Sequence, residues 1–388
     1  MEIREFYGEE TVRYRKLCAP LFHSQINEEQ IRQKVEEDKR RKKDFVRLGA
    51  FEDELIAAIE IHPYNIIFEN GTAKMGGIGG VISALEARGK GAVKKLFIKG
   101  FEKMYEQEQI ISHLFPFRGD YYRKFDYEVT AENTVWYIPT EYLRASEVGT
   151  VKLYDGSEKM KEDIKSIYHK FVLGKNLALA EHDWDKFFNE RRPYESQLFS
   201  YLHYTDDVAD GFLSYNMRAY EHKTQDVSVS NFWYTDKNGI SGILGYIASL
   251  KDHSDKCIVT CNDDLGAYFE FNGGWGKRDT ERKIEFRGST RIIDAEKVLL
   301  KKAFSGKAAI KIIDNFCPWN NDVFTISDGK VSRGQGDADA SMTMRAFSSL
   351  VMGRYDNLDF VPELEIYKNK ENLEKLFAKR KMWFDIHF

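Results

Sequence analysis

The stretch Gly79-Gly-Val-Ile-Ser-Ala-Leu-Glu-Ala-Arg-Gly-Lys-Gly-Ala-Val93 predicts an apolar strand, a sharp turn and the first turn of a helix. The turn is Arg88-Gly89-Lys90-Gly91, and its two glycines permit positive φ and leave no Cβ between the backbone and a ligand. The first N–H groups of a helix lack intrahelical partners and lie at the positive end of its dipole. Such a turn can hold a phosphate or pyrophosphate, with Arg88 and Lys90 as additional cationic donors. An ordinary Gly-rich strand–helix turn is the alternative, because a short turn of this kind is a weak indication by itself.

Length and composition limit the classes of protein to be considered. A chain of 388 residues with 42% hydrophobic and 14% aromatic residues is expected to form two or three folded domains. The net charge of −4, from 58 basic and 62 acidic residues, argues against a nucleic-acid partner and permits small cationic substrates. Because no apolar run approaches the roughly 20 residues that span a membrane and the N-terminus does not resemble a signal peptide, we expect a soluble cytoplasmic protein with no membrane partner.

The four cysteines, Cys18, Cys257, Cys261 and Cys317, are few and scattered. Cys257 and Cys261 lie in an apolar strand pattern, with no second pair of cysteines or histidines nearby. This spacing favours core packing in a reducing compartment over a metal site, so no metal cofactor is expected.

Periodicity predicts three successive units of mixed α/β (α+β) structure. The first unit is expected to comprise a helical stretch at residues 8–42, strands at 45–51, 55–62, 75–83, 110–115 and 129–138, a helix at 92–107 and a short helical turn at 119–125. A looser pattern near residues 140–150 predicts a linker, after which the same order of elements recurs. The corresponding turn, Thr235-Asp-Lys-Asn-Gly239, has only one glycine, which predicts a second copy of the fold without the anion-binding turn. The third unit should end in a helix at residues 369–381, capped by Asn369.

The C-terminus carries an unusual pattern, because Phe384, Ile386 and Phe388 alternate with Trp383, Asp385 and His387. Chain ends usually fray, so a period-2 apolar stripe ending in an aromatic residue predicts a pinned and buried end. The α-carboxylate of Phe388 would then lie inside the protein. Such a group needs partners or a raised pKa, and this combination can serve a function.

The order of strand, Arg-Gly-Lys-Gly-Ala, amphipathic helix, strand and Tyr-x-x-Phe-x-Tyr resembles the GNAT (Gcn5-related) N-acetyltransferases. Their acetyl-CoA loop is Gln/Arg-x-x-Gly-x-Gly/Ala; Arg88 and Gly91 match it, and Val93 stands where Gly or Ala is usual. In that family the strand before the loop splays and offers backbone groups to the pantetheine arm. The resemblance implies that acetyl-CoA binds to Val81, Ile82 and Ser83, to the loop residues Arg88, Gly89, Lys90, Gly91, Ala92, Val93 and Lys94, and to Phe117 and Arg118.

The whole chain resembles the Eis (enhanced intracellular survival) group of this superfamily. The resemblance implies a GNAT domain at residues 1–145, a degenerate GNAT-like domain at 146–286 and a sterol-carrier-like domain at 287–388, whose C-terminus reaches the active site. The segment Tyr122-Arg-Lys-Phe125-Asp-Tyr127 matches the Eis motif, so Tyr122 inherits the role of proton donor and the Phe388 carboxylate that of base. The resemblance further implies acetyl-CoA as cosubstrate, aminoglycosides as substrates and a homo-hexamer.

These roles agree with the chemistry of acetyl transfer to an amine. A carboxylate can take a proton from the substrate ammonium, and burial would raise its reference pKa of about 3.5 in the direction that catalysis requires. A phenol of reference pKa about 10 stays protonated and can protonate a departing thiolate. Without the resemblance, Tyr122 would be interpreted as a core aromatic residue. His62, His113 and His23 are also candidates for acid–base work, but lone histidines of this kind are more often structural groups.

Three functions follow, from two classes. The leading hypothesis is an acetyl-CoA-dependent N-acetyltransferase that acts on small cationic amines. The second is a protein or peptide lysine acetyltransferase. The third is an apolar-ligand carrier that uses the last domain and keeps vestigial acetyltransferase units; the intact loop from Arg88 to Gly91 argues against such decay.

Overall fold

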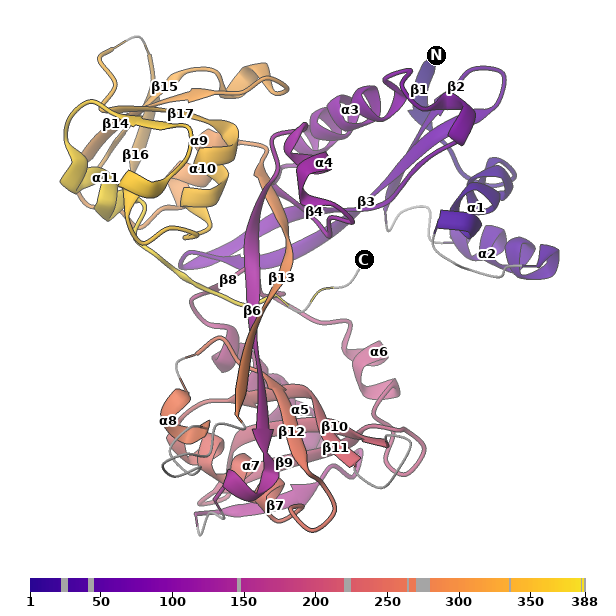
Figure 1. Cartoon of the computed structure of the whole chain (residues 1–388), viewed down its shortest axis with the longest axis vertical. Helices are drawn as coiled ribbons and strands as arrows, with labels where there is room; N and C mark the ends of the chain where they lie inside the picture. Colours follow the sequence, from indigo (N-terminus) through magenta and orange to yellow (C-terminus); the bar gives the residue numbers. More distant parts are fainter. Residues whose placement is uncertain are drawn as a thin grey trace. The chain divides into compact units, whose positions relative to one another are not determined.

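The computed structural model of the chain describes residues 1–21, 27–40, 45–144, 148–219, 225–263, 265–269, 280–334, 336–384 and 386. The chain divides into two compact units (Figure 1). Unit 1 combines Met1–Ala131 with Arg287–Arg380 and Asp385–Phe388, and unit 2 combines Glu132–Phe286 with Lys381–Phe384. Both units are mixed α/β, as the periodicity predicts. The division into three domains at residues 145 and 286 stays a prediction.

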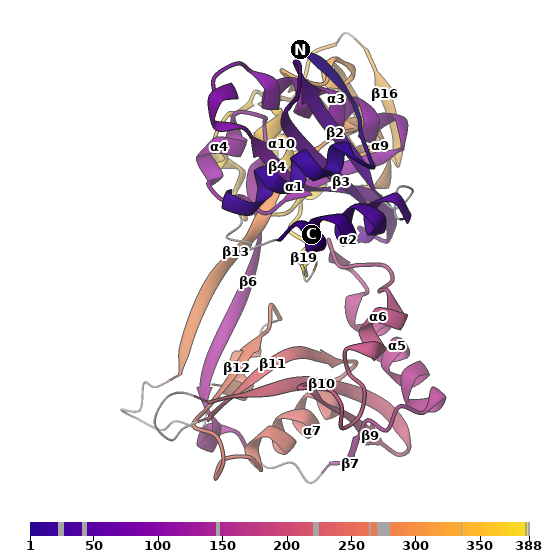
Figure 2. The same cartoon turned by 90° about the vertical axis from the view of Figure 1, so that its right-hand side faces the viewer.

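The N-terminal part of unit 1 is a sheet with helices on both faces. Its strand order is β1-β2-β3-β4-β5-β13, and the parallel pair β4–β5 is connected through α3. Gly100 of α3 lies against Ile59 and Ile61 of β3, whereas α1 packs on the opposite face, where Tyr14 meets Gly80 of β4 (Figure 2). The elements are β1 (Glu2–Glu5), α1 (Glu10–Leu21), α2 (Glu28–Arg40), β2 (Val46–Phe51), β3 (Leu55–Phe68), β4 (Gly71–Ser83), η1 (Leu85–Ala87), α3 (Ala92–Glu106), β5 (Gln109–Leu114), α4 (Gly119–Arg123), β6 (Glu128–Pro139) and β13 (Glu281–Ile292).

The helical stretch predicted over residues 8–42 forms two helices rather than one. Pro20 lies in the last turn of α1, where a missing N–H favours an end to the helix. The next helix starts after Asn27, whose side chain accepts from Gln30 N while the Gln30 side chain accepts from Asn27 N. This reciprocal capping box was present in the sequence and would have placed the boundary.

The C-terminal part of unit 1 is a second, five-stranded sheet of order β16-β15-β14-β17-β18. The prediction that Asn369 caps the last helix is wrong. Asn369 has φ 57° and its side chain accepts no hydrogen bond from the first turn of the helix. Its Nδ2 donates to Lys307 O (2.8 Å) and Asp339 Oδ2 (3.0 Å), and these bonds fix the orientation of the amide. The predicted end at residue 381 is also too late. The elements are α9 (Ala295–Lys301), β14 (Lys307–Ile313), η3 (Pro318–Asn320), β15 (Val323–Ser327), β16 (Lys330–Arg333), β17 (Ala340–Thr343), α10 (Met344–Val351), η4 (Leu358–Phe360), β18 (Leu364–Ile366) and α11 (Lys370–Leu376).

Unit 2 repeats the topology around α3. Strands β9, β10 and β11 form an antiparallel meander, and β11 then pairs in parallel with β12 through α7. Strands β2 to β5 with α3 have the same order and the same pairing. The pattern-based prediction of an internal repeat therefore agrees with the strand pairing. The elements are η2 (Thr140–Tyr142), β7 (Thr150–Leu153), α5 (Glu158–Val172), β8 (Lys175–Asn176), α6 (Trp184–Asn189), β9 (Phe199–Thr205), β10 (Val208–Ala219), β11 (Gln225–Tyr234), α7 (Lys237–Ala248), β12 (Lys256–Thr260), α8 (Gly266–Phe269) and β19 (Lys381–Met382), together with the C-terminal end of β6 and the N-terminal end of β13.

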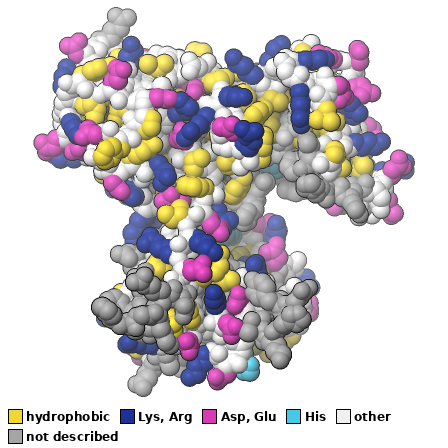
Figure 3. Space-filling view, in the orientation of Figure 1, with side chains coloured by type: hydrophobic (Ala, Val, Ile, Leu, Met, Phe, Trp, Pro, Cys, Tyr) yellow, Lys and Arg dark blue, Asp and Glu magenta, His cyan; other side chains and the backbone are white. Residues whose placement is uncertain are grey.

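Charged side chains of both signs are interspersed over the face seen in Figure 3. This agrees with the nearly balanced composition of the chain. None of the helices in the described part of the chain is long and apolar enough to cross a membrane.

A buried ion cluster ties α2 to the sheet on the face of α1. The Arg47 guanidinium is fully buried, and its Nη2 donates to Asp38 Oδ2 (3.0 Å) and Glu60 Oε1 (2.6 Å). Glu60 Oε2 also lies 3.2 Å from His62 Nε2. Desolvation raises the pKa of Glu60, but the His62 hydrogen bond and the Arg47 charge outweigh it and bring the pKa to about 2.

This cluster predicts a loss of stability in acid. The folded pKa of Glu60 lies below its ordinary value of 4.5, so its contribution is complete above pH 4.5 and falls as the pH drops toward 2. We expect Glu60→Gln to lower the free energy of unfolding by about 3 kcal/mol at pH 7, and the difference from wild type to shrink below pH 4.5. Urea unfolding between pH 7 and pH 3 measures both effects, with the exposed Glu54→Gln as control. A pH-independent difference would contradict the assignment.

Candidate functional site

Strand β4 changes course in the stretch from Gly79 to Ser83. Its pairing with β5 covers Lys74 to Ile78 and ends there. On its other side the register with β3 shifts between Ala58 and Glu60, which leaves one extra β4 residue and makes a bulge. Gly80 in this bulge has φ +55°, and a Cβ there would lie 2.1 Å from Tyr14 Oη, so only glycine fits. The end of β4 thus diverges from β5, as the splayed strand of the predicted site requires.

The turn after β4 leaves the N-terminus of α3 open. Gly91 is the N-cap residue with φ 76°, and among the described residues no side chain caps the helix. Gly89 has φ +81°, and a Cβ on either glycine would meet no atom within 4 Å. The first N–H groups of this 15-residue helix are therefore free for an anion.

A cavity of about 880 Å³ lies between the end of β4, the N-terminus of α3 and α4. Every residue predicted to bind the cofactor lines it except Lys90 and Arg118. The remaining lining residues, Ala87, Tyr121, Lys124 and Phe125, were not predicted. The helical spacing of Tyr121, Lys124 and Phe125 places them on one face of the turn that includes Tyr122, which is the indication that could have identified them. The lining is Val81, Ile82, Ser83, Ala87, Arg88, Gly89, Gly91, Ala92, Val93, Lys94, Phe117, Tyr121, Lys124 and Phe125.

The lysine and arginine side chains around this cavity differ in whether they are paired with a carboxylate. Lys90 Nζ donates to Glu52 Oε2 (2.9 Å), and Arg118 binds Asp120 through two hydrogen bonds of 3.1 Å and 2.6 Å. Both pairs are exposed, so a phosphate could compete for either cation. Arg88, Lys94 and Lys124 line the cavity directly and are the better-placed cations. A role for Lys90 or Arg118 stays a prediction.

Tyr122 is 3% exposed and lies directly behind the cavity lining. Its ring packs edge-on against Phe117 and Tyr121, with centroids 5.5 Å and 5.2 Å away. Burial raises the pKa of its hydroxyl well above the usual range, and the neighbouring Tyr121 adds to the effect. Among the residues that the structure describes, none forms a hydrogen bond with this hydroxyl. The phenol is thus protonated at neutral pH and its hydrogen-bonding capacity is available.

Of the three histidines considered as acid–base candidates, His23 lies outside the described residues, and the other two have structural surroundings. His113 is fully buried, its Nδ1 lies 2.9 Å from Thr290 Oγ1, and burial lowers its pKa to about 3. His62 contacts Glu60 of the ion cluster. Neither histidine lines the cavity.

The predicted base, the carboxylate of Phe388, lies outside the described residues, as do Asp385 and His387. The tail before them is fixed within unit 2. Asn133 Nδ2 donates to Phe384 O (3.1 Å), Asn262 Nδ2 donates to Met382 O (3.1 Å), and Trp383 N donates to Asn176 O (3.1 Å). The side chains of Trp383, Phe384 and Ile386 are buried, so the prediction of a pinned tail holds up to Ile386.

The equivalent turn of unit 2 has a different helix start. Asp236 is the N-cap residue of α7, and its carboxylate accepts from Asn238 N (2.8 Å) and Gly239 N (3.1 Å). A carboxylate thus already occupies the position that an anion would take at this helix. This arrangement favours a single anion-binding turn per chain, the one before α3.

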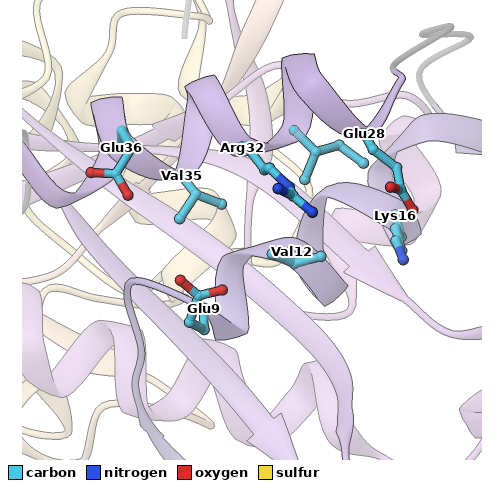
Figure 4. Close-up of a pocket in the computed structure, with 8 residues that line it drawn as sticks. Glu9, Val12, Lys16, Glu28, Arg32, Val35 and Glu36 are labelled. Carbon is cyan, nitrogen blue, oxygen red and sulfur yellow. The ribbon is translucent and has the colours of Figure 1, made fainter.

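A second groove, of about 610 Å³, lies between α1 and α2 (Figure 4). It combines an apolar floor with charges of both signs. Its lining is Glu9, Val12, Lys16, Glu28, Ile31, Arg32, Val35 and Glu36. These features match the packing seam of two surface helices better than a reactive site.

Residues 2–130 match the acetyltransferase (GNAT) domain family, and residues 295–385 match the sterol carrier protein domain family. The chain is therefore an enzyme with a GNAT N-acetyltransferase domain and a sterol-carrier-like C-terminal domain.

Solved structures extend the likeness to the whole chain. A probable N-acyltransferase from Enterococcus faecalis V583 shares 21% identity at a TM-score of 0.84, over 100% of this chain and 99% of that chain. A GCN5-related N-acetyltransferase from Anabaena variabilis shares 18% sequence identity at a TM-score of 0.81, over 99% of each chain. Eis1 from Mycobacterium abscessus shares 16% sequence identity at a TM-score of 0.78, over 100% of each chain. The fold is thus Eis-like throughout. A search of curated protein sequences found no match.

Proposed function

We propose that this protein transfers the acetyl group of acetyl-CoA to amines of small cationic molecules, with aminoglycosides as the first class to test. The observation that carries the proposal is the open, glycine-bounded N-terminus of α3 at a cavity lined by the splayed end of β4. The acidic balance of the chain permits cationic substrates, and the sequence resemblance to the Eis group points to aminoglycosides.

In this proposal acetyl-CoA supplies an activated thioester, and the chain supplies orientation and proton transfer. The N–H groups at the start of α3, with Lys94 and Lys124, would hold the phosphates. Backbone N–H groups of Val81 to Ser83 would hold the thioester oxygen. The amine nitrogen attacks the carbonyl carbon directly and the carbon–sulfur bond breaks, so no acyl-enzyme is needed.

Two proton transfers complete the reaction. The carboxylate of Phe388 would take the proton that the substrate ammonium must lose, directly or through a water. Tyr122 would give its proton to the departing thiolate. The raised pKa of Tyr122 keeps this proton in place but makes the phenol a weaker acid. The same dry surroundings raise the pKa of the thiol, which restores part of the match between the two groups.

A reducing cytoplasmic location is part of the proposal, because all four cysteines are free and buried. Assembly into a homo-hexamer is proposed from the sequence resemblance to the Eis group alone. Size-exclusion chromatography with light scattering measures it directly.

The test combines binding and turnover. Calorimetry with CoA should give one site per chain, and acetyl-CoA with a panel of aminoglycosides, polyamines and lysine peptides should release free thiol, with product masses increased by one or more acetyl groups. Turnover restricted to lysine peptides would favour a protein acetyltransferase. No CoA binding would favour an apolar-ligand carrier and overturn the proposal.

A further inference from the structure

A loop of the C-terminal domain packs onto the acetyltransferase domain behind the cavity. This loop, residues 314–321 between β14 and β15, contacts the side of α3 with two half-buried aromatic residues, Phe316 and Trp319. Phe316 meets the end of α3 near the cavity, and Trp319 meets the other end. All of these residues belong to unit 1.

The loop is held rigidly by one buried carboxylate. Asp314 is 4% exposed, and its Oδ1 accepts from Arg291 Nη2 (2.6 Å), Phe316 N (2.9 Å) and Cys317 N (3.0 Å). Its Oδ2 accepts from Asn320 Nδ2 (2.9 Å). Arg291 lies on β13, which pairs with β5 of the acetyltransferase sheet. The position of Phe316 is therefore fixed relative to the acetyltransferase domain and not only to its own domain.

Phe316 contacts two residues that line the cavity. Its ring centroid is 6.1 Å from that of Phe125 and 5.7 Å from Lys94 Nζ, which lies over the ring. Phe125 in turn stacks on Phe97 at 4.3 Å with an interplanar angle of 4°, and Phe97 meets Tyr122 edge-on at 6.1 Å. A continuous series of ring contacts thus runs from the C-terminal domain to the proposed proton donor.

We infer that Phe316 is a positioning residue of the acetyl-CoA site, through which the C-terminal domain orients Phe125 and the Lys94 ammonium. This inference rests on the proposed use of the cavity for acetyl-CoA. Lys94 is exposed, with a flexible stem, and a cation–π contact restricts where its charge lies. Phe125 forms part of the cavity wall, so loss of the ring behind it would let that wall relax.

The structure provides a matched control on the same loop. Trp319 packs on Tyr105 with centroids 4.5 Å apart, at the C-terminal end of α3. Lys94 and Tyr105 are eleven residues apart, or about 16 Å along the helix axis. Trp319→Ala and Phe316→Ala therefore each remove one aromatic contact between the same loop and the same helix, but only Phe316 contacts the cavity lining.

The test measures CoA affinity by calorimetry and the KM for acetyl-CoA in the full-length chain. Phe316→Ala should weaken both about tenfold, with kcat changed less than threefold. Phe316→Leu keeps the apolar volume but loses the ring, and it should weaken the CoA affinity and raise the KM for acetyl-CoA about threefold. This variant can replace Phe316→Ala if the alanine variant does not fold. Trp319→Ala should lower the melting temperature and leave both constants within twofold of wild type.

Two results would overturn the inference. Wild-type affinity in both Phe316 variants would show that the ring does not position the site, and equal weakening in Trp319→Ala would show that the loop acts only through general stability. These outcomes are separate from the proposed function, since CoA affinity is measured without an amine. A wild-type chain that binds CoA but acetylates none of the amines would refute the proposed transfer and leave the Phe316 comparison intact.

Discussion

Replacing Tyr122 with Phe is expected to lower kcat for acetyl transfer about 100- to 1,000-fold, because a positioned general acid contributes on this scale. The change removes one oxygen from a residue whose ring stays packed against Phe117 and Tyr121. The affinity for CoA should therefore change little, and the loss should lie in kcat rather than in KM. Steady-state kinetics with saturating amine, together with CoA calorimetry, separate the two quantities.

Tyr121→Phe is the matched control for this experiment. Tyr121 is adjacent in sequence and lines the cavity, and burial raises the pKa of its hydroxyl as well. If Tyr122 is the acid, Tyr121→Phe should keep kcat within about threefold of wild type. Equal losses in the two variants would refute the role of Tyr122, and so would a Tyr122→Phe variant with wild-type kcat.

One glycine added after Phe388 is expected to lower kcat about 100-fold or more. The extension leaves every side chain unchanged but moves the α-carboxylate by about one residue length, roughly 3.5 Å. A displacement of about 1 Å can already cost a factor of 100 in a reaction that depends on near-attack geometry. The loss should depend on pH, because an amine that is already neutral at high pH no longer needs the base. Rates between pH 6 and pH 10 measure this recovery.

Phe388→Leu serves as the control for the extension, since it keeps the carboxylate in place and changes only the side chain. This variant should retain most of the activity. Undiminished activity in the extended chain would exclude the terminal carboxylate as the base. A second titratable group would then have to be sought as the base.

Much of the acetyltransferase fold could be predicted because its signals are local. The helix predicted at residues 92–107 is α3 (Ala92–Glu106), and the strand predicted at residues 110–115 is β5 (Gln109–Leu114). Periodicity, turn glycines and caps each act over a few residues, so they can be recognised from the sequence alone. The same logic fails where a side chain has a distant partner. Asparagine is a residue type that often caps helices, but the side-chain amide of Asn369 is oriented by its hydrogen bonds to Lys307 and Asp339.

The sequence alone determined the chemistry of the turn, because glycine adopts the positive φ angles of Gly89 and Gly91 without strain and the first N–H groups of any helix lack partners. It also indicated the lack of a second anion-binding turn, which the carboxylate of Asp236 explains physically. Of the cations predicted from the sequence, Arg88 and Lys94 line the cavity, whereas Lys90 and Arg118 lie outside the lining and pair with Glu52 and Asp120. Only the tertiary structure added Lys124 to the lining. Tertiary packing alone also brought Phe316, nearly two hundred residues from Phe125, against the cavity wall, since no local pattern encodes a contact between separate domains.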